Sequence, residues 1–278
     1  MASTFNFTKM HGLGNDFVVI DAINQRIHLS QDHIRILASR HFGVGCDQVL
    51  IIEAPDEEDI DFIYRIYNAD GSEVGQCGNG ARCFARYVHD KGLTDKQSIN
   101  VKTATGKMVL NLQPDDNVTV DMGRPRFQPG DIPVASHTQE LLYTVDVDDQ
   151  CVEFGAVSMG NPHAVLQVDD IDTAPVRKLG PLLEKHDFFP ERANIGFMQV
   201  VNRQHIRLRV FERGSGETLA CGSGACAAMV VARSQNLIDH CATVSLLGGD
   251  LTIVWEGDDS PVLMTGPASY VFEGQITL

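Results

Sequence analysis

Basic residues are scarce in this sequence of 278 residues. Lys and Arg together number 22 against 37 Asp and Glu, which gives a formal net charge of -15 at pH 7. A protein that binds nucleic acid neutralises phosphates with clustered Lys and Arg, whereas the basic residues here are scattered along the chain. The sequence therefore argues against a nucleic-acid partner, and its acidity is typical of a surface that keeps a protein in solution.

Long apolar segments are also missing. No apolar run approaches the roughly 20 residues that a membrane-spanning helix needs. The opening residues, Met-Ala-Ser-Thr-Phe-Asn-Phe-Thr-Lys, lack the apolar core of a signal peptide. We therefore expect no membrane partner and a cytoplasmic location.

The cysteines lack the arrangement of a disulfide framework or a zinc site. Their number, seven, is odd, and thiols stay reduced in the cytoplasm. The spacings Cys77-x5-Cys83 and Cys221-x4-Cys226 differ from the paired Cys-x2-Cys sets of structural zinc sites. No metal is predicted, and a metal-binding module is the weakest hypothesis. If helices begin at Cys77 and Cys221, the other two cysteines are expected to be small buried apolar residues.

Two segments of the chain repeat each other around a cysteine. The first reads Asn68-Ala-Asp-Gly-Ser-Glu-Val-Gly-Gln-Cys-Gly-Asn-Gly-Ala-Arg-Cys83, and the second reads Glu212-Arg-Gly-Ser-Gly-Glu-Thr-Leu-Ala-Cys-Gly-Ser-Gly-Ala-Cys226. Two further pairs occur in the same order: residues 13–19 match 159–165 around Gly-Asn, and residues 45–51 match 196–201 around Gly-x-x-Gln-Val. An internal duplication is the simplest explanation. The Pro- and Gly-rich stretch that begins at Met122 places the boundary between residues 1–122 and 123–266.

The expected elements agree with a duplicated α+β fold. Turn-bounded β-branched runs predict strands at 17–22, 48–53, 60–67, 99–103, 107–112, 118–122, 152–157, 164–168, 196–201, 205–211, 243–247, 251–255 and 262–265. Helices are predicted at 31–40, 78–90, 175–185 and 222–234. The helices after the two cysteines are apolar on most faces, which indicates burial. We therefore predict two pseudo-symmetric domains, each a mixed, mostly antiparallel sheet that curls like a barrel around a central helix.

A Cys-Gly-x-Gly helix start can support chemistry. The first turn of a helix has free backbone N–H groups and a partial positive charge, which lower the pKa of a thiol there. Glycine lets a ligand approach the backbone, so the N–H groups of Gly78, Asn79, Gly222 and Ser223 could bind a carboxylate. The alternative is that both motifs are ordinary glycine-rich turns with buried cysteines.

Two matched thiols favour proton transfer over nucleophilic catalysis. A thiolate nucleophile normally needs a histidine base, and neither cysteine motif contains a histidine. One thiolate could abstract a proton from a carbon while the other thiol donates a proton to the opposite face, which inverts the centre. Binding of pyridoxal phosphate would need a glycine-rich phosphate-binding loop and a lysine that bonds the cofactor. The sequence shows no such combination, so no cofactor is expected. A thiol redox protein with Cys77 and Cys221 as a switchable pair is the alternative from a different class.

Four motifs resemble the diaminopimelate epimerase family over essentially the whole chain. They are Met-His-Gly-Leu-Gly-Asn-Asp-Phe at 10–17, the two cysteine segments at 68–83 and 212–225, and Gly-Asn-Pro-His at 160–163. The resemblance implies cofactor-independent interconversion of LL- and meso-diaminopimelate in lysine and peptidoglycan precursor biosynthesis. It also implies a homodimer, and a C-terminal strand at 267–278 that returns to the first half.

The resemblance also implies roles for individual residues. Cys77 and Cys221 would be the acid/base pair, supported by His163 and Glu212. Residues that would bind substrate are Asn15, Gln48, Asn68, Gly78, Asn79, Asn161, Asn194, Glu212, Arg213, Gly222 and Ser223. Taken singly, each asparagine is as easily a turn residue, and His163 is as easily a core histidine beside Pro162.

Related substrates are the nearest alternative. A racemase of proline or hydroxyproline, or another isomerase of the same fold, could use the same two thiols. Proline-type substrates have no second amino acid group to hold, so Arg213 and the set of asparagines favour diaminopimelate.

Overall fold

The computed structural model describes residues 4–75, 77–148 and 150–278. The chain divides into two compact units: unit 1 comprises residues 1–120 and 266–278, and unit 2 comprises residues 121–265. Strands that pair mostly antiparallel, together with helices α1 to α4, confirm the predicted α+β class. Within the described ranges, no helix is long and apolar enough to cross a membrane.

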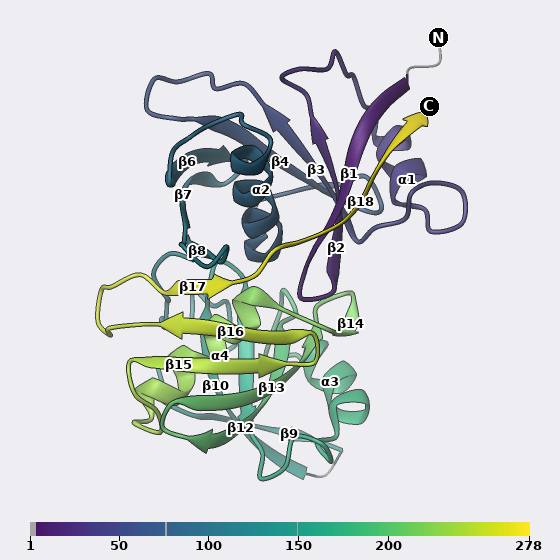
Figure 1. Ribbon diagram of the computed structural model, residues 1–278. Helices are drawn as coiled ribbons and strands as arrows, with labels where there is room; N and C mark the ends of the chain where they lie inside the picture. The colour runs from purple at the N-terminus through teal and green to yellow at the C-terminus, as the bar shows by residue number, and fades with distance from the viewer. Residues whose placement is uncertain (1–3, 76, 149) are drawn as a thin grey trace. The chain divides into compact units, whose positions relative to one another are not determined.

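Unit 1 is a curled mixed sheet with two helices (Figure 1). Its elements are β1 (Thr4–Gly12), β2 (Asn15–Asp21), α1 (Gln31–Ala38), β3 (Gln48–Glu53), β4 (Phe62–Asn68), β5 (Glu73–Val74), α2 (Gly78–Asp90), β6 (Ser98–Thr103), β7 (Gly106–Leu112), β8 (Val118–Asp121) and β18 (Ser269–Thr277). The pairs β2–β3 and β4–β6 are parallel, and the pairs β1–β2, β3–β4, β4–β5, β6–β7 and β7–β8 are antiparallel. The last strand, β18, runs antiparallel along β1.

From β10 onward, unit 2 repeats this order of elements up to β8, and it has one additional strand, β9, before them. It contains β9 (Tyr143–Val147), β10 (Gln150–Ser158), β11 (Pro162–Gln167), α3 (Val176–Glu184), β12 (Asn194–Asn202), β13 (His205–Glu212), β14 (Gly216–Thr218), α4 (Gly222–Ser234), β15 (Cys241–Leu246), β16 (Gly249–Val254) and β17 (Leu263–Gly266). The parallel pairs β11–β12 and β13–β15 correspond to β2–β3 and β4–β6. The repeated sequence motifs therefore lie on repeated elements.

The central helices are buried because the sheets enclose them. Helix α2 contacts β1, β2, β3 and β7, and α4 contacts β10 to β13, β15 and β16. Both helices begin and end where the sequence predicted. Most of their inward residues are small or apolar, and Cys83 and Cys226 are fully buried among them, as expected, whereas Arg82 of α2 is a fully buried charged residue. Burial of most of its faces explains why α4 consists mainly of Ala, Val, Met and Gly.

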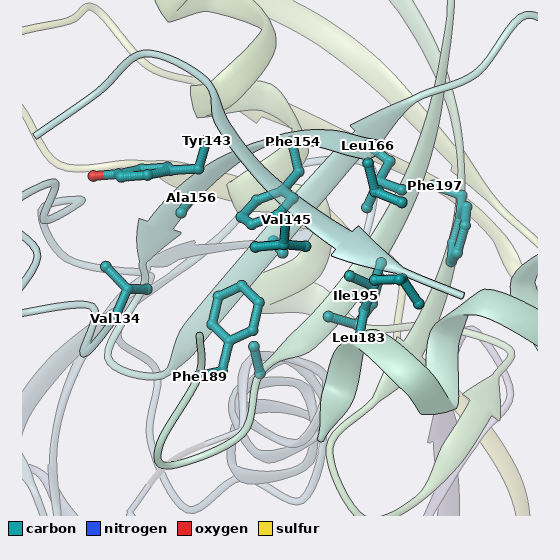
Figure 2. Packing of buried hydrophobic residues seen from close by; sticks show 14 of the residues in the cluster. Val134, Tyr143, Val145, Phe154, Ala156, Leu166, Leu183, Phe189, Ile195 and Phe197 are labelled. Carbon is teal, nitrogen blue, oxygen red and sulfur yellow. The ribbon is translucent and has the colours of Figure 1, made fainter. Parts of the chain in front are cut away.

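Helices α1 and α3 cover the outer face of each sheet. In unit 1, Val18 and Ile20 of β2 join a cluster with Ile34 and Leu37 of α1. In unit 2, Figure 2 shows Leu183 of α3 among aromatic and aliphatic side chains of the strands. Strands between two helices are buried on both faces, so they read as continuous apolar runs rather than alternating ones.

Some strands were not predicted from the residues alone: β1, β5, β9, β14 and, apart from the family resemblance, β18. Strand β1 contains Lys9, and lysine is seldom buried. Here the Lys9 side chain is buried, with 7% exposed, because it pairs with Asp16. Strand β18 is largely exposed and shows no apolar alternation. Helix α1 ends at Ala38 rather than at residue 40, because the backbone of Ser39 is extended.

The strand register corrects one of the proposed matched pairs. Gln48 lies opposite Phe17 in the parallel pair β2–β3, and Asn194 lies opposite His163 in β11–β12. Phe17 and His163 each follow the aligned Asn15 and Asn161 by two positions. The counterpart of Gln48 is therefore Asn194 and not Gln199, so the match between 45–51 and 196–201 was wrong. The shared Gly-x-x-Gln-Val letters are not structurally equivalent.

Candidate active site

Both repeated cysteines are the N-cap residues of the central helices. Cys77 (φ -145°, ψ 116°) precedes α2, and Cys221 (φ -120°, ψ 108°) precedes α4. Their carbonyl groups accept the first helical hydrogen bonds, from Ala81 N at 2.8 Å and from Ala225 N at 3.0 Å. The N–H groups of the intervening residues have no acceptor inside the helix. Each unit therefore presents one thiol beside backbone donors that suit an anion.

The second glycine of each motif serves close packing. A Cβ at Gly80 would lie 2.6 Å from Oη of Tyr64. A Cβ at Gly224 would lie 3.0 Å from Val210 and 3.2 Å from Sγ of Cys221. The glycines let the helix start approach the sheet, and only the first two residues after each cysteine are left for the predicted carboxylate cradle.

In unit 1, Cys77 lies beside two predicted asparagines. Its Sγ is 3.7 Å from Oδ1 of Asn15, which also accepts a hydrogen bond from Nδ2 of Asn79 at 3.3 Å. Asn15 follows the turn Leu13-Gly14, in which both residues have positive φ, 56° and 88°. Such two-residue turns match the twist of a β-hairpin. The turn places Asn15 next to the start of α2.

A second pair of predicted residues meets at the ends of β3 and β4. Nε2 of Gln48 donates to Oδ1 of Asn68 at 2.9 Å, and Nδ2 of Asn68 donates to Oγ of Ser72 at 3.3 Å. The strand register puts Gln48 and Asn68 directly opposite each other. Both side chains are half-buried, so they remain accessible to a small polar ligand.

In unit 2, the thiol of Cys221 is held in its protonated form. Burial is the main cause that raises its pKa well above the usual value, and the negative charge and hydrogen bond of Glu212 add to it. The N–H of Gly224 and the hydroxyl of Ser223 act in the opposite direction. The helix start therefore lowers the pKa of this thiol as expected, but the net shift is upward. Desolvation and a nearby carboxylate outweigh the helix N-terminus.

His163 connects Asn161 to the start of α4. Its Nε2 lies 3.0 Å from Oδ1 of Asn161 and 3.1 Å from Oγ of Ser223. Nδ2 of Asn161 donates to Oγ of Ser223 at 3.4 Å, and Oγ of Ser223 is 3.7 Å from Sγ of Cys221. Burial, with a smaller contribution from the positive charge of Arg213, lowers the pKa of His163 to about 3. A neutral imidazole is thus part of the scaffold around Ser223.

The turn after β13 carries Glu212 and Arg213. Asn194 accepts the backbone N–H of Arg213 with Oδ1 at 3.0 Å, and Oε1 of the buried Glu184 accepts the N–H of Gly214 at 2.9 Å. Asn194 therefore holds the turn through the backbone of Arg213. The Arg213 side chain is exposed, and its Nη1 donates to a backbone carbonyl, that of Glu191, at 3.0 Å.

The glutamates four positions before each cysteine stabilise hairpins. Arg209 of β13 contacts Glu217 of β14 with its Nη2 at 2.6 Å, and Arg65 of β4 contacts Glu73 of β5 with its Nη1 at 3.3 Å. These equivalent ion pairs join the short strand before each cysteine to its neighbour. Their repetition in both cysteine segments reflects the shared scaffold.

Several residues around the two thiols were missed by sequence reasoning. Tyr64, which is fully buried, donates from Oη to the carbonyl of Cys77 at 3.3 Å. Thr218 donates from Oγ1 to Oε1 of Glu212. Asp47 accepts from Nδ2 of Asn15 at 2.9 Å. Thr218 and Asp47 lie within repeated stretches, but none of the three has a residue of the same type at the equivalent position of the other unit.

Other candidate sites lie away from the thiols. A cavity of about 570 Å³ in unit 2 is lined by residues such as Arg233, Ser234 and Trp255, at the opposite end of α4 from Cys221. Among the residues that the structure describes, no group of three or more His, Cys, Asp or Glu could hold a metal ion. All seven cysteines are free thiols.

Comparison with known proteins places these features in a family. Residues 7–128 and 155–271 match the family described as diaminopimelate epimerase. The fold is similar to that of a phenazine biosynthesis protein of the PhzF family from Bacillus anthracis, with a TM-score of 0.70, 16% identity and 99% of each chain covered. It is also similar to a hydroxyproline epimerase from Agrobacterium vitis with bound trans-4-hydroxy-L-proline, with a TM-score of 0.70, 15% identity and coverage of 99% of this chain and 93% of that chain.

A predicted epimerase from Pseudomonas aeruginosa gives a TM-score of 0.68 at 17% identity, with 98% of this chain and 99% of that chain covered. At these identities, the solved structures show a shared fold. The family match, in contrast, rests on the sequence and includes both cysteine segments with their glycine-rich helix starts. This chain belongs to the diaminopimelate epimerase family.

Proposed function

We propose that this protein interconverts LL-diaminopimelate and meso-diaminopimelate without a cofactor, in lysine and peptidoglycan precursor biosynthesis. One observation carries the proposal: each unit places a thiol at the N-cap of its central helix, next to N–H groups without helical acceptors. Membership of an epimerase family supports an isomerase. A carbon centre is inverted when one group removes its proton from one face and a second group returns a proton to the opposite face.

The proposed reaction uses the two sulfur atoms in different protonation states. A thiolate at Cys77 takes the α-proton, and the S–H group of Cys221 donates its proton to the opposite face of the same carbon. One C–H bond breaks and another forms, so nothing is oxidised or reduced. Burial and Glu212 keep the proton on Cys221, which suits Cys221 to the donor role. In the reverse direction the two sulfurs exchange roles.

The helix starts would stabilise the charge that develops during the reaction. As the α-proton leaves, negative charge spreads onto the substrate carboxylate. The backbone N–H groups of Gly78-Asn79 and Gly222-Ser223 are the proposed donors to that carboxylate. His163 is proposed as a positioning residue, since its contact with Ser223 fixes the second residue of α4.

Recognition of the distal amino acid group is assigned to the polar residues at the strand ends. The exposed guanidinium of Arg213 suits a carboxylate. The amide oxygens of Gln48 and Asn68 suit an ammonium group. A proline-type substrate has no such distal group, so these residues favour diaminopimelate over proline or hydroxyproline.

Proton exchange with solvent tests the proposal. In heavy water, the wild type should introduce deuterium at one α-carbon of diaminopimelate as it inverts that carbon, as followed by NMR and mass spectrometry. Cys77→Ala and Cys221→Ala should each lower the rate of inversion by roughly 10²–10⁴-fold, the usual contribution of a general acid or base. Cys151→Ala, which alters an exposed cysteine, is the matched control and should keep full activity.

Two outcomes would reject the proposal. The two-thiol mechanism is excluded if the double cysteine variant inverts the substrate at the wild-type rate. The thiol redox alternative would replace it if the protein turned over a disulfide substrate rapidly and showed no inversion of diaminopimelate. Racemisation of proline, with no activity on diaminopimelate, would retain the mechanism and reject the substrate.

We also propose a homodimer, as the family resemblance implies. Val271 and Phe272 of β18 are 54% and 48% exposed, and β18 pairs with β1 on one side. An exposed apolar strand at a sheet edge is a suitable surface for a second copy of the chain.

A further inference from the structure

A cluster of charged residues contacts Asn15, the asparagine next to Cys77. Asp47 accepts from Nδ2 of Asn15 at 2.9 Å with Oδ2, and its Oδ1 lies 2.8 Å from Nη2 of Arg40. Arg40 also makes two hydrogen bonds to Asp16, at 2.9 and 3.0 Å, and Asp16 pairs with the buried Lys9 at 2.6 Å. Asp16 and Asp47 also bind each other directly. The backbone N–H of Asp16 donates to the Asp47 carboxylate at 3.1 Å, and the backbone N–H of Asp47 donates to the Asp16 carboxylate at 2.8 Å.

The order of elements shared by the two units does not require carboxylates at these two positions, although Asp16 also pairs with the buried Lys9 in unit 1. By strand register, the positions of Asp16 and Asp47 correspond in unit 2 to Pro162 and Ala193. Unit 2 nevertheless builds the same strand pairs and the same helix start. The two acids are therefore specific to the half-site of Cys77.

The two equivalent asparagines are turned in opposite directions. A carboxylate can only accept hydrogen bonds, so Asp47 fixes the NH2 group of Asn15 on its own side. Oδ1 of Asn15 then faces Sγ of Cys77, at 3.7 Å. In unit 2, Oδ1 of Asn161 contacts His163, and its NH2 group points to Ser223 beside Cys221.

We propose that Asp47 is a positioning residue of the Cys77 half-site, which holds Asn15 with its carbonyl oxygen, rather than its NH2 group, toward the thiol. An acceptor next to sulfur stabilises the S–H form and leaves the thiolate without a donor from Asn15, so the thiolate is a stronger base. This role rests on the proposed function insofar as Cys77 removes a substrate proton. Arg40 and Asp16 support it by fixing the Asp47 carboxylate.

The reactivity of Cys77 tests this inference without substrate. Asp47→Ala removes the acceptor that holds the NH2 group of Asn15. The amide can then rotate against its 3.3 Å hydrogen bond from Nδ2 of Asn79 and donate to sulfur, so the rate of alkylation of Cys77 by iodoacetamide at pH 7 should rise. We expect an increase of about fivefold, the factor that a typical net hydrogen bond makes in an equilibrium. The rates are followed for each cysteine by peptide mass spectrometry, and Cys221 in the same sample is the internal control.

A double-mutant cycle separates positioning from a direct effect of charge. Asn15→Ala should itself raise the rate at Cys77, and adding Asp47→Ala should then change little, because Asp47 acts through Asn15. The inference is overturned if Asp47→Ala leaves Cys77 unchanged, if its effect persists in the Asn15→Ala background, or if Cys221 accelerates equally. Asp47→Ser, which is too short to reach Asn15, gives the same readout if the alanine variant does not fold.

Epimerase assays on the same variants distinguish this inference from the proposed function. A lower kcat at similar KM in Asp47→Ala, together with faster alkylation, supports both. Faster alkylation in a protein whose wild type does not act on diaminopimelate would retain the role of Asp47 and reject the proposed substrate. Unchanged alkylation in an active epimerase would reject the role of Asp47 alone.

Discussion

For single residues, the surroundings of the two repeated cysteines differ although their sequence segments are similar. Cys221 faces the carboxylate of Glu212 and is buried, which keeps its proton in place. Cys77 is partly exposed and faces the amide oxygen of Asn15. In a reversible two-base reaction, one sulfur carries a proton and the other does not, and the two exchange these states when the direction is reversed. Different surroundings for equivalent thiols are consistent with a defined resting distribution of that proton.

The buried, neutral His163 should make the protein sensitive to acid. Its folded-state pKa is about 3, whereas an unfolded histidine titrates near 6.5. Between these values the unfolded state binds the additional proton, so the free energy of unfolding falls as pH falls from about 6.5 toward 3. His163→Gln should remove up to about 1.4 kcal/mol of this dependence per pH unit. Urea unfolding at pH 6.5, 5.5 and 4.5 measures the slope.

The control for this prediction is His137→Gln, which alters an exposed histidine. It should leave the slope unchanged. Equal slopes for the wild type and His163→Gln would mean that His163 binds a proton in the folded state, against the effect of its burial.

Asp16 should contribute to stability at neutral pH. Burial would raise its pKa, but hydrogen bonds from Arg40 and Lys9 hold it well below the usual value. A depressed carboxyl pKa stabilises the folded state above the unfolded-state value of about 4, and this contribution is lost as pH falls further. Asp16→Asn should therefore lower the free energy of unfolding by roughly 1–3 kcal/mol at pH 7, by loss of charged hydrogen bonds beside the buried Lys9.

Denaturation of wild type and Asp16→Asn at pH 7 and pH 3 tests this sign. The difference between the two proteins should shrink at pH 3. Asp116→Asn removes the carboxylate of an exposed pair with Arg86 and should have little effect at either pH. A difference that stayed constant between pH 7 and pH 3 would contradict the assigned charge of Asp16.

At the scale of elements, each site depends on a helix that starts close to a sheet. Glycine at the third position after the cysteine lets α2 and α4 approach β4 and β13 without a collision. The hairpins β4–β5 and β13–β14 then bring the chain back to each cysteine. The motif Cys-Gly-x-Gly therefore combines two requirements: backbone donors for a ligand and space for the helix.

Gly80→Ala should destabilise the protein despite the better helix propensity of alanine. The new Cβ would lie 2.6 Å from Oη of Tyr64 and 3.2 Å from Phe17, and overpacking of this kind typically costs about 1–3 kcal/mol. Thermal unfolding should show the loss. Tyr64→Phe in the same chain removes the colliding oxygen and should restore part of the stability.

The matched control is Gly130→Ala, because a Cβ at Gly130 meets no atom within 4 Å. It should be close to neutral. If Gly80→Ala were as stable as Gly130→Ala, the helix start could move away from the sheet, and the proposed role of the second glycine would be lost.

At the scale of the whole molecule, two units repeat one order of elements, and a final strand completes the first. Strand β18 follows unit 2 in the sequence but pairs with β1 over the length of both strands. Phe272 packs edge-to-face on Phe7 of β1, with ring centroids 5.9 Å apart. The neighbouring Val271 remains 54% exposed, which makes β18 the natural place to test association.

Sedimentation should show a dimer with twice the 30.5 kDa of one chain. Val271→Asp should weaken the dimer by roughly two orders of magnitude or more, since burying an unpaired carboxylate costs several kcal/mol. Val201→Asp, at an exposed valine of unit 2, should leave the dimer intact. A wild-type monomer, or a Val271→Asp protein that still sediments as a dimer, would reject β18 as the interface.

Local patterns along the chain predicted the features that depend on neighbouring residues. The starts of α2 and α4 follow from Cys-Gly-x-Gly before an apolar run, and their observed bounds agree with those predicted. The α+β class and the two repeated cysteines follow from local patterns in the same way. Family membership rests on these motifs as well.

The surroundings of the repeated residues, in contrast, depend on contacts between elements that are far apart in the sequence. The equivalence of Gln48 with Asn194 depends on strand register, which similar letters failed to predict. The protonation of Cys221 depends on its burial and on Glu212, and the direction of the Asn15 amide depends on Asp47. The helix start, a local feature, favours a thiolate, but desolvation and charges brought from other strands are stronger at Cys221 and reverse that preference.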